Sequence, residues 1–288
     1  MKYLNYNKQK ISAEDIKSVI KVLRSERITQ GKFINIFEKK LNRYFGSKHA
    51  LAISNATSAL FLIGKILKWK KNDHVILSPL TFVSGANSVL FSGATPVFVD
   101  VNRNDQNLDP VLVEKKIKEL KSKNKKVKAI IITDYAGNPA DWKYFRKIKK
   151  RNNLILINDN CHALGASYYN DKKYAMKFSD FVVHSYHAVK NITTAEGGAI
   201  FIKNSDNFKK LRILREHGFE QNDKRNPFNY NLKQIGFNFR LSDLNCGLGI
   251  SQLSRIDSII KKRDYYSKFY DKYFINNNLV ETPKREKN

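Results

Sequence analysis

The chain has 288 residues, 42% hydrophobic and 12% aromatic, which is enough for one large domain or for one domain and part of a second. This composition excludes a disordered protein, and the longest apolar runs, residues 129–133 and 154–157, are too short to span a bilayer. The N-terminal residues lack a signal-peptide pattern, and Cys161 and Cys246 are too few for a disulfide framework. We therefore expect a cytoplasmic protein with no membrane partner.

The net charge of +27 raises the possibility of a nucleic-acid or anionic-surface binder. The lysines, however, are spread over the whole chain. The two denser stretches, residues 116–128 and 143–151, also carry Leu and Ile at helical spacing, which indicates solvated outer faces of helices. The distribution disfavours a nucleic-acid partner and is better suited to attracting a small anionic substrate.

Short β-branched runs alternate with helical patterns along the chain. Strands are predicted at residues 50–54, 74–78, 96–100, 128–133, 154–158, 180–185 and 199–202, and helices at 13–24, 33–45, 57–67, 82–91, 110–120, 142–150, 206–215 and 241–261. A further aromatic helical pattern covers residues 264–274. Strands separated by helices form βαβ units, so the predicted fold class is α/β with a mainly parallel sheet between helices.

The first candidate site follows the strand predicted at residues 50–54. Asn55, Ala56, Thr57 and Ser58 lead there into a helix. Ligands of open α/β sheets bind at the carboxyl ends of strands, and small residues at a helix N-terminus favour an anion site. Taken alone, the segment is more typical of an ordinary N-cap formed by Thr57 or Ser58.

The second candidate is acidic. Asp159 follows the strand predicted at residues 154–158, and His162 lies three residues further on. A carboxylate at this strand end lies at the crevice, although an ordinary turn residue explains it equally well. His162 by itself is more typical of a packed histidine.

The third candidate is Lys190, in a loop that leaves one predicted strand at Ser185 and returns to another through Gly197 and Gly198. A lone lysine in so basic a chain carries no information. A loop of this kind holds a lysine in the crevice, where its amine can serve Schiff-base chemistry. Together with Asp159 and the helix start at Thr57, it supplies the amine, carboxylate and phosphate cradle that pyridoxal phosphate requires.

The chain resembles the DegT/DnrJ/EryC1/StrS family of nucleotide-sugar aminotransferases, from about residue 11 to residue 262. The segments that carry the resemblance are residues 28–31, 55–60, 81–83, 93–100, 134–137, 159–165, 185–198, 236–240 and 249–253. The resemblance implies the large domain of the fold-type I pyridoxal phosphate enzymes at residues 1–255. Residues 256–288 would then begin a small C-terminal domain that is largely missing.

The resemblance also implies roles for individual residues. Lys190 would hold pyridoxal phosphate and carry the proton, Asp159 would pair with the pyridinium nitrogen, and His162 would lie near the phenolic oxygen. The remaining cofactor-binding residues would be Phe82, stacked on the ring, and Thr57, Ser58 and Ser185 at the phosphate. Asn238 would reach the cofactor phosphate of a neighbouring subunit, which implies a homodimer with shared active sites.

The amino-acid sequence at residues 135–137, 162–165 and 190–198 is most similar to one branch of the family. That branch aminates C4 of a UDP-linked 4-keto-6-deoxy-N-acetylhexosamine on the pseudaminic acid pathway, for surface-glycan synthesis. By the same resemblance the amino donor is L-glutamate. The reaction would consist of two half-reactions, in which nitrogen passes from donor to cofactor and then to the keto sugar.

Four alternatives remain at this stage. A truncated, inactive paralogue would only dimerise or bind sugar nucleotide, because most of the small domain is absent. A sugar dehydratase of the same superfamily would carry histidine in place of Lys190. A nucleic-acid or surface binder would show clustered charge. A metal site at His184 and His187 lacks acidic or cysteine ligands at suitable spacing, so no metal is expected.

Overall fold

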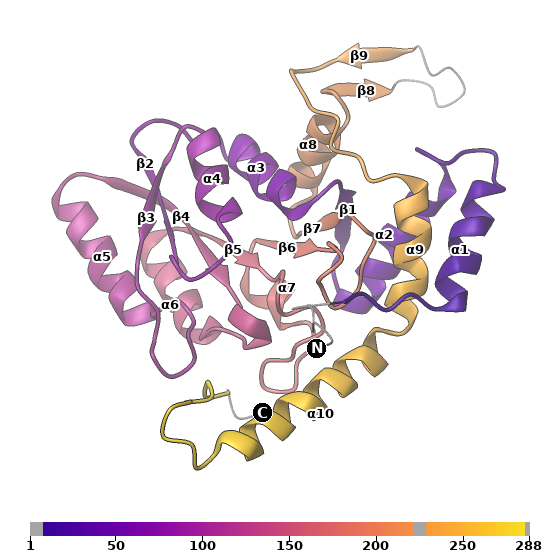
Figure 1. The fold of residues 1–288 in the computed structure, drawn as a ribbon. Helices are drawn as coiled ribbons and strands as arrows, with labels where there is room; N and C mark the ends of the chain where they lie inside the picture. Colours follow the sequence, from indigo (N-terminus) through magenta and orange to yellow (C-terminus); the bar gives the residue numbers. More distant parts are fainter. Residues whose placement is uncertain (1–7, 222–228, 286–288) are drawn as a thin grey trace.

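The computed structural model describes residues 8–221 and 229–285, whose centre is a seven-stranded sheet of order β1-β7-β6-β5-β4-β2-β3 (Figure 1). Its strands are β1 (His49–Ile53), β2 (Asp73–Leu77), β3 (Thr95–Phe98), β4 (Lys126–Thr133), β5 (Ile155–Asp159), β6 (Phe181–Ser185) and β7 (Gly198–Ile202). β3, β2, β4, β5 and β6 pair in parallel, whereas β7 is antiparallel to both β6 and β1. The predicted α/β class with a mainly parallel sheet is confirmed.

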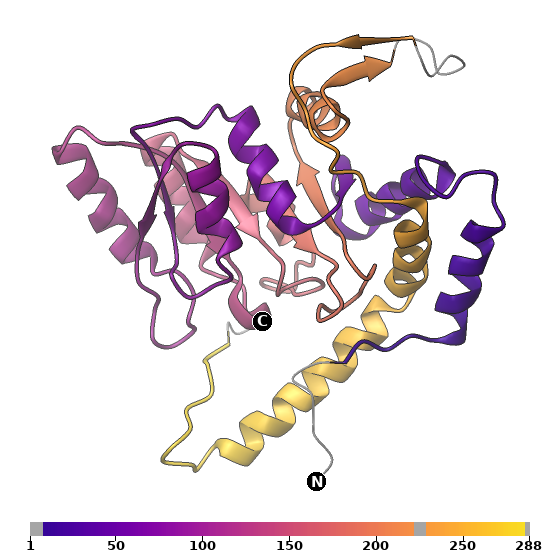
Figure 2. The same cartoon turned by 45° about the horizontal axis from the view of Figure 1, so that its top comes forward.

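Helices cover both faces of the sheet (Figures 1 and 2). One face packs against α3 (Ala56–Ile66), α4 (Ser84–Phe91) and α8 (Ser205–Arg215). The other packs against α5 (Pro110–Ser122), α6 (Trp142–Asn152) and α7 (Tyr174–Phe178) at one end, and against α2 (Lys32–Phe45) and α9 (Asp243–Ser254) at the other. We call the first the α3 face and the second the α6 face. α1 (Ala13–Leu23) packs on the outside of α9.

Alternation along the strands determines which residue points to which face. In β5, Ile157 belongs to the core of the α3 face, and Leu156 belongs to the core of the α6 face. In β7 the same division separates Ile200 from Phe201. Both faces are buried, which explains why these strands are apolar throughout rather than alternating.

Helix starts follow from capping residues in the sequence. The N-cap expected at Thr57 or Ser58 is wrong, since Asn55 caps α3 by accepting a hydrogen bond from Ser58 N–H at 2.8 Å and both residues lie inside the helix. α2 begins after Gly31, which has no side chain to cap it. A distant carboxylate takes over, because Asp243 accepts from the N–H groups of Gly31 at 2.5 Å, Phe33 at 2.6 Å and Ile34 at 3.2 Å.

The single helix predicted at residues 241–261 is wrong. The chain forms two helices, α9 and α10 (Ile256–Phe274), which meet at Arg255. Arg255 leaves helical geometry, with φ −108° and ψ 5°, and its guanidinium pairs with the buried Asp15 of α1. That pairing joins residues 240 positions apart, which a local pattern does not reveal.

Beyond Ile256, which is buried, α10 extends along the outside of the molecule (Figure 2). Tyr265, Phe269 and Tyr273 on it are 56–71% exposed. The structure also contains three elements that the sequence did not predict: the short 3₁₀ helix η1 (Tyr135–Gly137), the five-residue α7, and a hairpin of β8 (Phe219–Gln221) and β9 (Tyr230–Leu232). No helix in the described part of the chain is long and apolar enough to cross a membrane.

Candidate active site

Asp159 is the last residue of β5 and is 4% exposed. It lies between two parallel neighbours, since it is in register with Thr133 of β4 and with Val183 of β6. Alternation after Ile157 directs its side chain to the α3 face. Its Oδ1 accepts a hydrogen bond from Cys161 N–H at 3.2 Å. The carboxylate is therefore fixed at the carboxyl edge of the sheet, where the sequence predicted it.

The start of α3 lies directly over the paired ends of β6 and β7. Ser185 is in register with Gly198 across these strands. A Cβ added to Gly198 would lie 2.9 Å from Ala56 N and 2.7 Å from His184 O, so only glycine permits this approach. Because both contacts are to backbone, neither can move away easily. The close approach places the N-terminus of α3 beside Ser185.

The first turn of α3 offers donors to an anion. Ser58 is buried, and its N–H is already bound by Asn55. The N–H groups of Ala56 and Thr57 belong to the turn in which an α-helix supplies no acceptor. The Thr57 hydroxyl is half-buried there, and Ser54 Oγ donates to Ser58 Oγ at 3.1 Å. This end of the helix can bind a phosphate through N–H groups, hydroxyls and the helix dipole.

Lys190 is half-buried in the loop between β6 and β7, and its N–H donates to His187 O at 2.9 Å. Its charge acts on Cys161 and His162, which follow Asp159 in the chain. Burial lowers the pKa of His162, and the Lys190 charge lowers it further, while Asp159 opposes both. Burial raises the pKa of the Cys161 thiol well above its usual value, and the Asp159 charge adds to this. His162 is thus neutral at pH 7, and Cys161 is a protonated thiol rather than a nucleophile.

Phe82 lies in the loop before α4, and its side chain is 67% exposed. The helix predicted to begin at residue 82 instead begins at Ser84. Thr81 Oγ1 lies 3.1 Å from Thr133 Oγ1, so the loop is attached to the residue beside Asp159 in the sheet. This attachment presents the Phe82 ring at the carboxyl edge of the sheet.

Asn238 is the predicted site residue that the single chain does not bring to the others. Phe237 and Phe239 pack against the core of the α3 face, and the Asn238 side chain between them is exposed. Phe239 O accepts from Ser54 N–H at 2.9 Å, so the segment passes close to the start of α3 while Asn238 points outward.

Several residues at this edge were given no role by sequence reasoning. Thr81 and Thr133 hold the Phe82 loop, and Asn55 caps α3. Asp134, directly after β4, is fully buried among hydrogen-bond donors. The signal for Asp134 was available, because it is a carboxylate at the carboxyl end of a buried strand, as Asp159 is.

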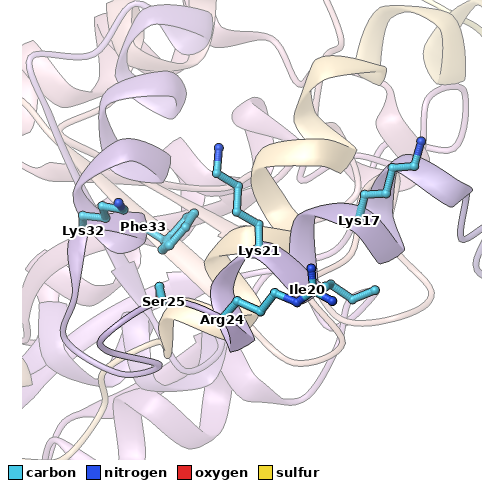
Figure 3. Close-up of a pocket in the computed structure, with 7 residues that line it drawn as sticks. All are labelled: Lys17, Ile20, Lys21, Arg24, Ser25, Lys32 and Phe33. Carbon is cyan, nitrogen blue, oxygen red and sulfur yellow. The ribbon is translucent and has the colours of Figure 1, made fainter.

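Two further features lie outside this arrangement. No cluster of three His, Cys, Asp or Glu side chains able to hold a metal occurs among the described residues. His184 is fully buried against Phe45 and Phe201, and burial lowers its pKa to about 3. A cavity of about 630 Å³ opens between α1 and α2 (Figure 3). Its lining is Lys17, Ile20, Lys21, Arg24, Ser25, Lys32 and Phe33, none of which is a predicted site residue.

The residues present fit pyridoxal phosphate. The approach that Gly198 permits leaves the α3 N-terminus and the Ser185 hydroxyl on one side for a phosphate dianion. Asp159 could supply the carboxylate for a protonated ring nitrogen, Lys190 could supply the amine, and Phe82 could supply an aromatic face. These groups belong to different chain segments and meet at one edge of the sheet.

Comparison with known proteins identifies the family of the chain. Residues 9–288 match the DegT/DnrJ/EryC1/StrS aminotransferase family. A Campylobacter jejuni protein named UDP-4-amino-4,6-dideoxy-N-acetyl-beta-L-altrosamine transaminase is 39% identical over 282 residues, which cover 98% of this chain and 72% of that protein. A Helicobacter pylori protein of the same name is 38% identical over 279 residues, covering 96% and 71%.

Two solved structures are also similar to this chain. Helicobacter pylori PseC, described as an aminotransferase involved in the biosynthesis of pseudoaminic acid, superposes with a TM-score of 0.87 at 37% identity, covering 96% of this chain and 72% of PseC. A sugar aminotransferase from Streptococcus pneumoniae in its PLP form gives a TM-score of 0.84 at 28% identity, covering 95% and 72%. The resemblance found in the sequence is confirmed: the chain belongs to the DegT/DnrJ/EryC1/StrS aminotransferase family, and it is a sugar aminotransferase that depends on pyridoxal phosphate.

Proposed function

We propose that the chain transfers an amino group from L-glutamate to C4 of a UDP-linked 4-keto-6-deoxy-N-acetylhexosamine. The observation that carries the proposal is the position of Lys190 beside the Asp159–His162 segment at the carboxyl edge of the sheet. The choice of substrate is supported by the Campylobacter and Helicobacter relatives, whose names specify a 4-amino-4,6-dideoxy sugar.

Pyridoxal phosphate, when bound, supplies an electron sink for the carbanion that forms when the amino-bearing carbon loses its proton. Lys190 would hold the cofactor through Nζ and would move the proton at the substrate carbon, first as general base and then as general acid. Asp159 would keep the ring nitrogen protonated by a charge-assisted hydrogen bond. Because His162 is neutral, it can donate to or accept from the phenolic oxygen without adding a charge.

The residues at the start of α3 orient rather than react. Thr57, Ser58 and Ser185 would bind the phosphate, and Phe82 would cover one face of the ring, which would hold the reacting carbon within reach of Lys190 Nζ. The surplus of basic residues, 53 against 26 acidic, attracts the diphosphate of the nucleotide sugar.

We further propose that the enzyme is a homodimer in which Asn238 completes the phosphate site of the partner subunit. The outward direction of Asn238 from a segment bonded to Ser54 supports this arrangement. In the same proposal, residues 1–255 form the cofactor-binding domain and residues 256–288 begin a second unit, since α10 buries little beyond Ile256.

The test uses the purified chain with pyridoxal phosphate. Its visible absorption is recorded before and after L-glutamate, and borohydride reduction followed by peptide mapping locates the attached lysine. We expect a band that bleaches with glutamate and a label on Lys190. The glutamate-treated protein should then aminate the UDP-4-keto sugar, with the new amine at C4 by NMR.

Two variants and one control make the test specific. Lys190→Ala should lose the label and all amino transfer, whereas Lys203→Ala, a matched change at the end of β7, should retain both. Asp159→Asn should still be labelled but bleach on the order of 10²-fold more slowly. Amino transfer by Lys190→Ala would refute the assignment. A labelled but glutamate-insensitive wild type would instead identify an inactive paralogue.

A further inference from the structure

Asp134 is the centre of a buried hydrogen-bond cluster on the α6 face of the sheet. Its carboxylate accepts five hydrogen bonds, at Oδ1 from Ala140 N–H and Trp142 Nε1, each at 2.9 Å, and at Oδ2 from Asn158 Nδ2 and Asn160 Nδ2, each at 3.0 Å, and from the Tyr174 hydroxyl at 2.7 Å. The donors come from β5 and the residue after it, from the start of α6 and from α7. One side chain therefore connects several separate segments.

The donor set favours an ionised Asp134. Burial raises the pKa of this carboxyl, but its hydrogen bonds oppose the shift. Four of the five partners are N–H groups, which cannot accept a proton from a neutral acid. The fifth, the Tyr174 hydroxyl, already accepts from Asn160 Nδ2 at 3.0 Å. If Asp134 were protonated, its carboxyl hydrogen would thus face groups that are themselves hydrogen-bond donors.

The cluster holds both neighbours of Asp159. Asn158 and Asn160 point to the α6 face, where Asp134 binds them, and Asp159 between them points to the α3 face. Asn160 N–H also continues the strand ladder by donating to Val183 O at 3.0 Å. Rotation of the Asp159 backbone would have to break hydrogen bonds on either side of it.

We infer that Asp134 is a positioning residue for the transamination: by binding Asn158 and Asn160 on one face of the sheet, it fixes the direction of the Asp159 carboxylate on the other. The inference rests on the proposed pairing of Asp159 with the ring nitrogen of the cofactor. Asp134 itself does not touch the reacting atoms. Asp134 acts by setting the orientation of the charge-assisted hydrogen bond made by Asp159. The strength of such a bond falls steeply as the donor and acceptor lose alignment.

The chain offers a matched pair of variants. Tyr174→Phe removes one hydroxyl from Asp134. Tyr144→Phe removes a hydroxyl that donates to Glu114 Oε2 at 2.8 Å on the outer side of α6, with no link to Asp159. Both changes delete one tyrosine–carboxylate hydrogen bond, and Tyr174→Phe also deletes the one that its hydroxyl accepts from Asn160. Asn160→Ala serves as a second probe of the cluster, and Asp134→Asn tests its centre.

The first readout needs no cofactor. Hydrogen exchange of the amides at residues 158–161 in the cofactor-free chain should accelerate about tenfold in Tyr174→Phe and Asn160→Ala, and stay unchanged in Tyr144→Phe. The second uses pyridoxal phosphate labelled with ¹⁵N in the ring. Its chemical shift reports the proton on that nitrogen, and it should move towards the unprotonated value in the cluster variants, with kcat for the glutamate half-reaction about tenfold lower and KM within twofold.

Asp159→Asn separates the two proposals. If Asp159→Asn leaves the ring-nitrogen shift and kcat unchanged, the proposed role of Asp159 fails. If Asp159→Asn alters both while folded Tyr174→Phe, Asn160→Ala and Asp134→Asn behave as wild type, the positioning role of Asp134 is overturned. Equal effects in Tyr144→Phe would also overturn it, because they would show a general loss of stability.

Discussion

Thr81 Oγ1 lies 3.1 Å from Thr133 Oγ1, and this contact attaches the loop that carries Phe82 to the strand next to Asp159. Neither threonine is charged or reactive. The hydrogen bond nevertheless sets how the aromatic face and the carboxylate lie relative to each other, because Thr133 is in register with Asp159. A cofactor ring that stacks on Phe82 and pairs with Asp159 depends on that spacing.

Thr133→Val keeps the shape of the side chain and removes the hydroxyl. We expect the Kd for pyridoxal phosphate to rise about fivefold, the typical effect of one neutral hydrogen bond. Titration of the absorption band measures it. Thr95→Val, on the exposed outer strand β3, is the control and should bind as wild type. An unchanged Kd in Thr133→Val would show that the Phe82 loop holds its place without this contact.

Gly198→Ala tests the close approach of α3 to β7. The new Cβ would meet three backbone atoms at 2.7–2.9 Å, and α3 would have to move away from Ser185. We expect at least tenfold weaker binding of pyridoxal phosphate and a lower melting temperature. Gly85→Ala, within α4, is the matched change, because its Cβ meets only Leu77 Cδ1 of β2, at 3.3 Å. Tight binding by Gly198→Ala would contradict the assigned phosphate cradle.

His184 should make the protein acid-sensitive. Its folded pKa of about 3 lies below the unfolded value of about 6.5, so the unfolded state binds a proton first as the pH falls. Its contribution to stability is complete above pH 6.5 and decreases by about 1.4 kcal/mol per pH unit towards pH 3. Denaturant unfolding at pH 6.5, 5.5 and 4.5 measures the slope, which should be smaller by that amount in His184→Leu. Parallel slopes would show that His184 is protonated in the folded state.

Asp243→Ala should destabilise the fold without touching the cofactor residues. Asp243 is fully buried and accepts from three N–H groups at the start of α2, where Gly31 provides no cap. Leaving those donors unpaired costs about 2 kcal/mol of unfolding free energy. Asp206→Ala, an exposed acid in the first turn of α8, should cost less than about 1 kcal/mol. Chemical denaturation measures the unfolding free energy of both variants, and equal losses would contradict the capping role of Asp243.

The elements were predictable because each is encoded locally. All seven sheet strands and most helices lie within a few residues of their predicted bounds, and Asp159 was found because it follows an apolar run. What the sequence did not reveal depends on distant partners. Arg255, where the predicted helix is interrupted, forms an ion pair with Asp15 of α1. Asp134 accepts hydrogen bonds from residues of β5, α7 and the segment that begins α6. Such pairings become visible only when the chain is folded.

The loop that carries Lys190 is fixed at its base. Tyr186 N–H donates to Gly197 O at 2.8 Å, and Thr194 N–H donates to Tyr186 O at 2.9 Å, so the two ends are joined just beyond the β6–β7 pair. An anchored backbone leaves the four methylenes of the lysine as its freely moving part. In the proposed reaction, the amine of Lys190 would therefore stay on a short tether near the reacting carbon. Its high local concentration would let it return ahead of water, because recapture would be an intramolecular event.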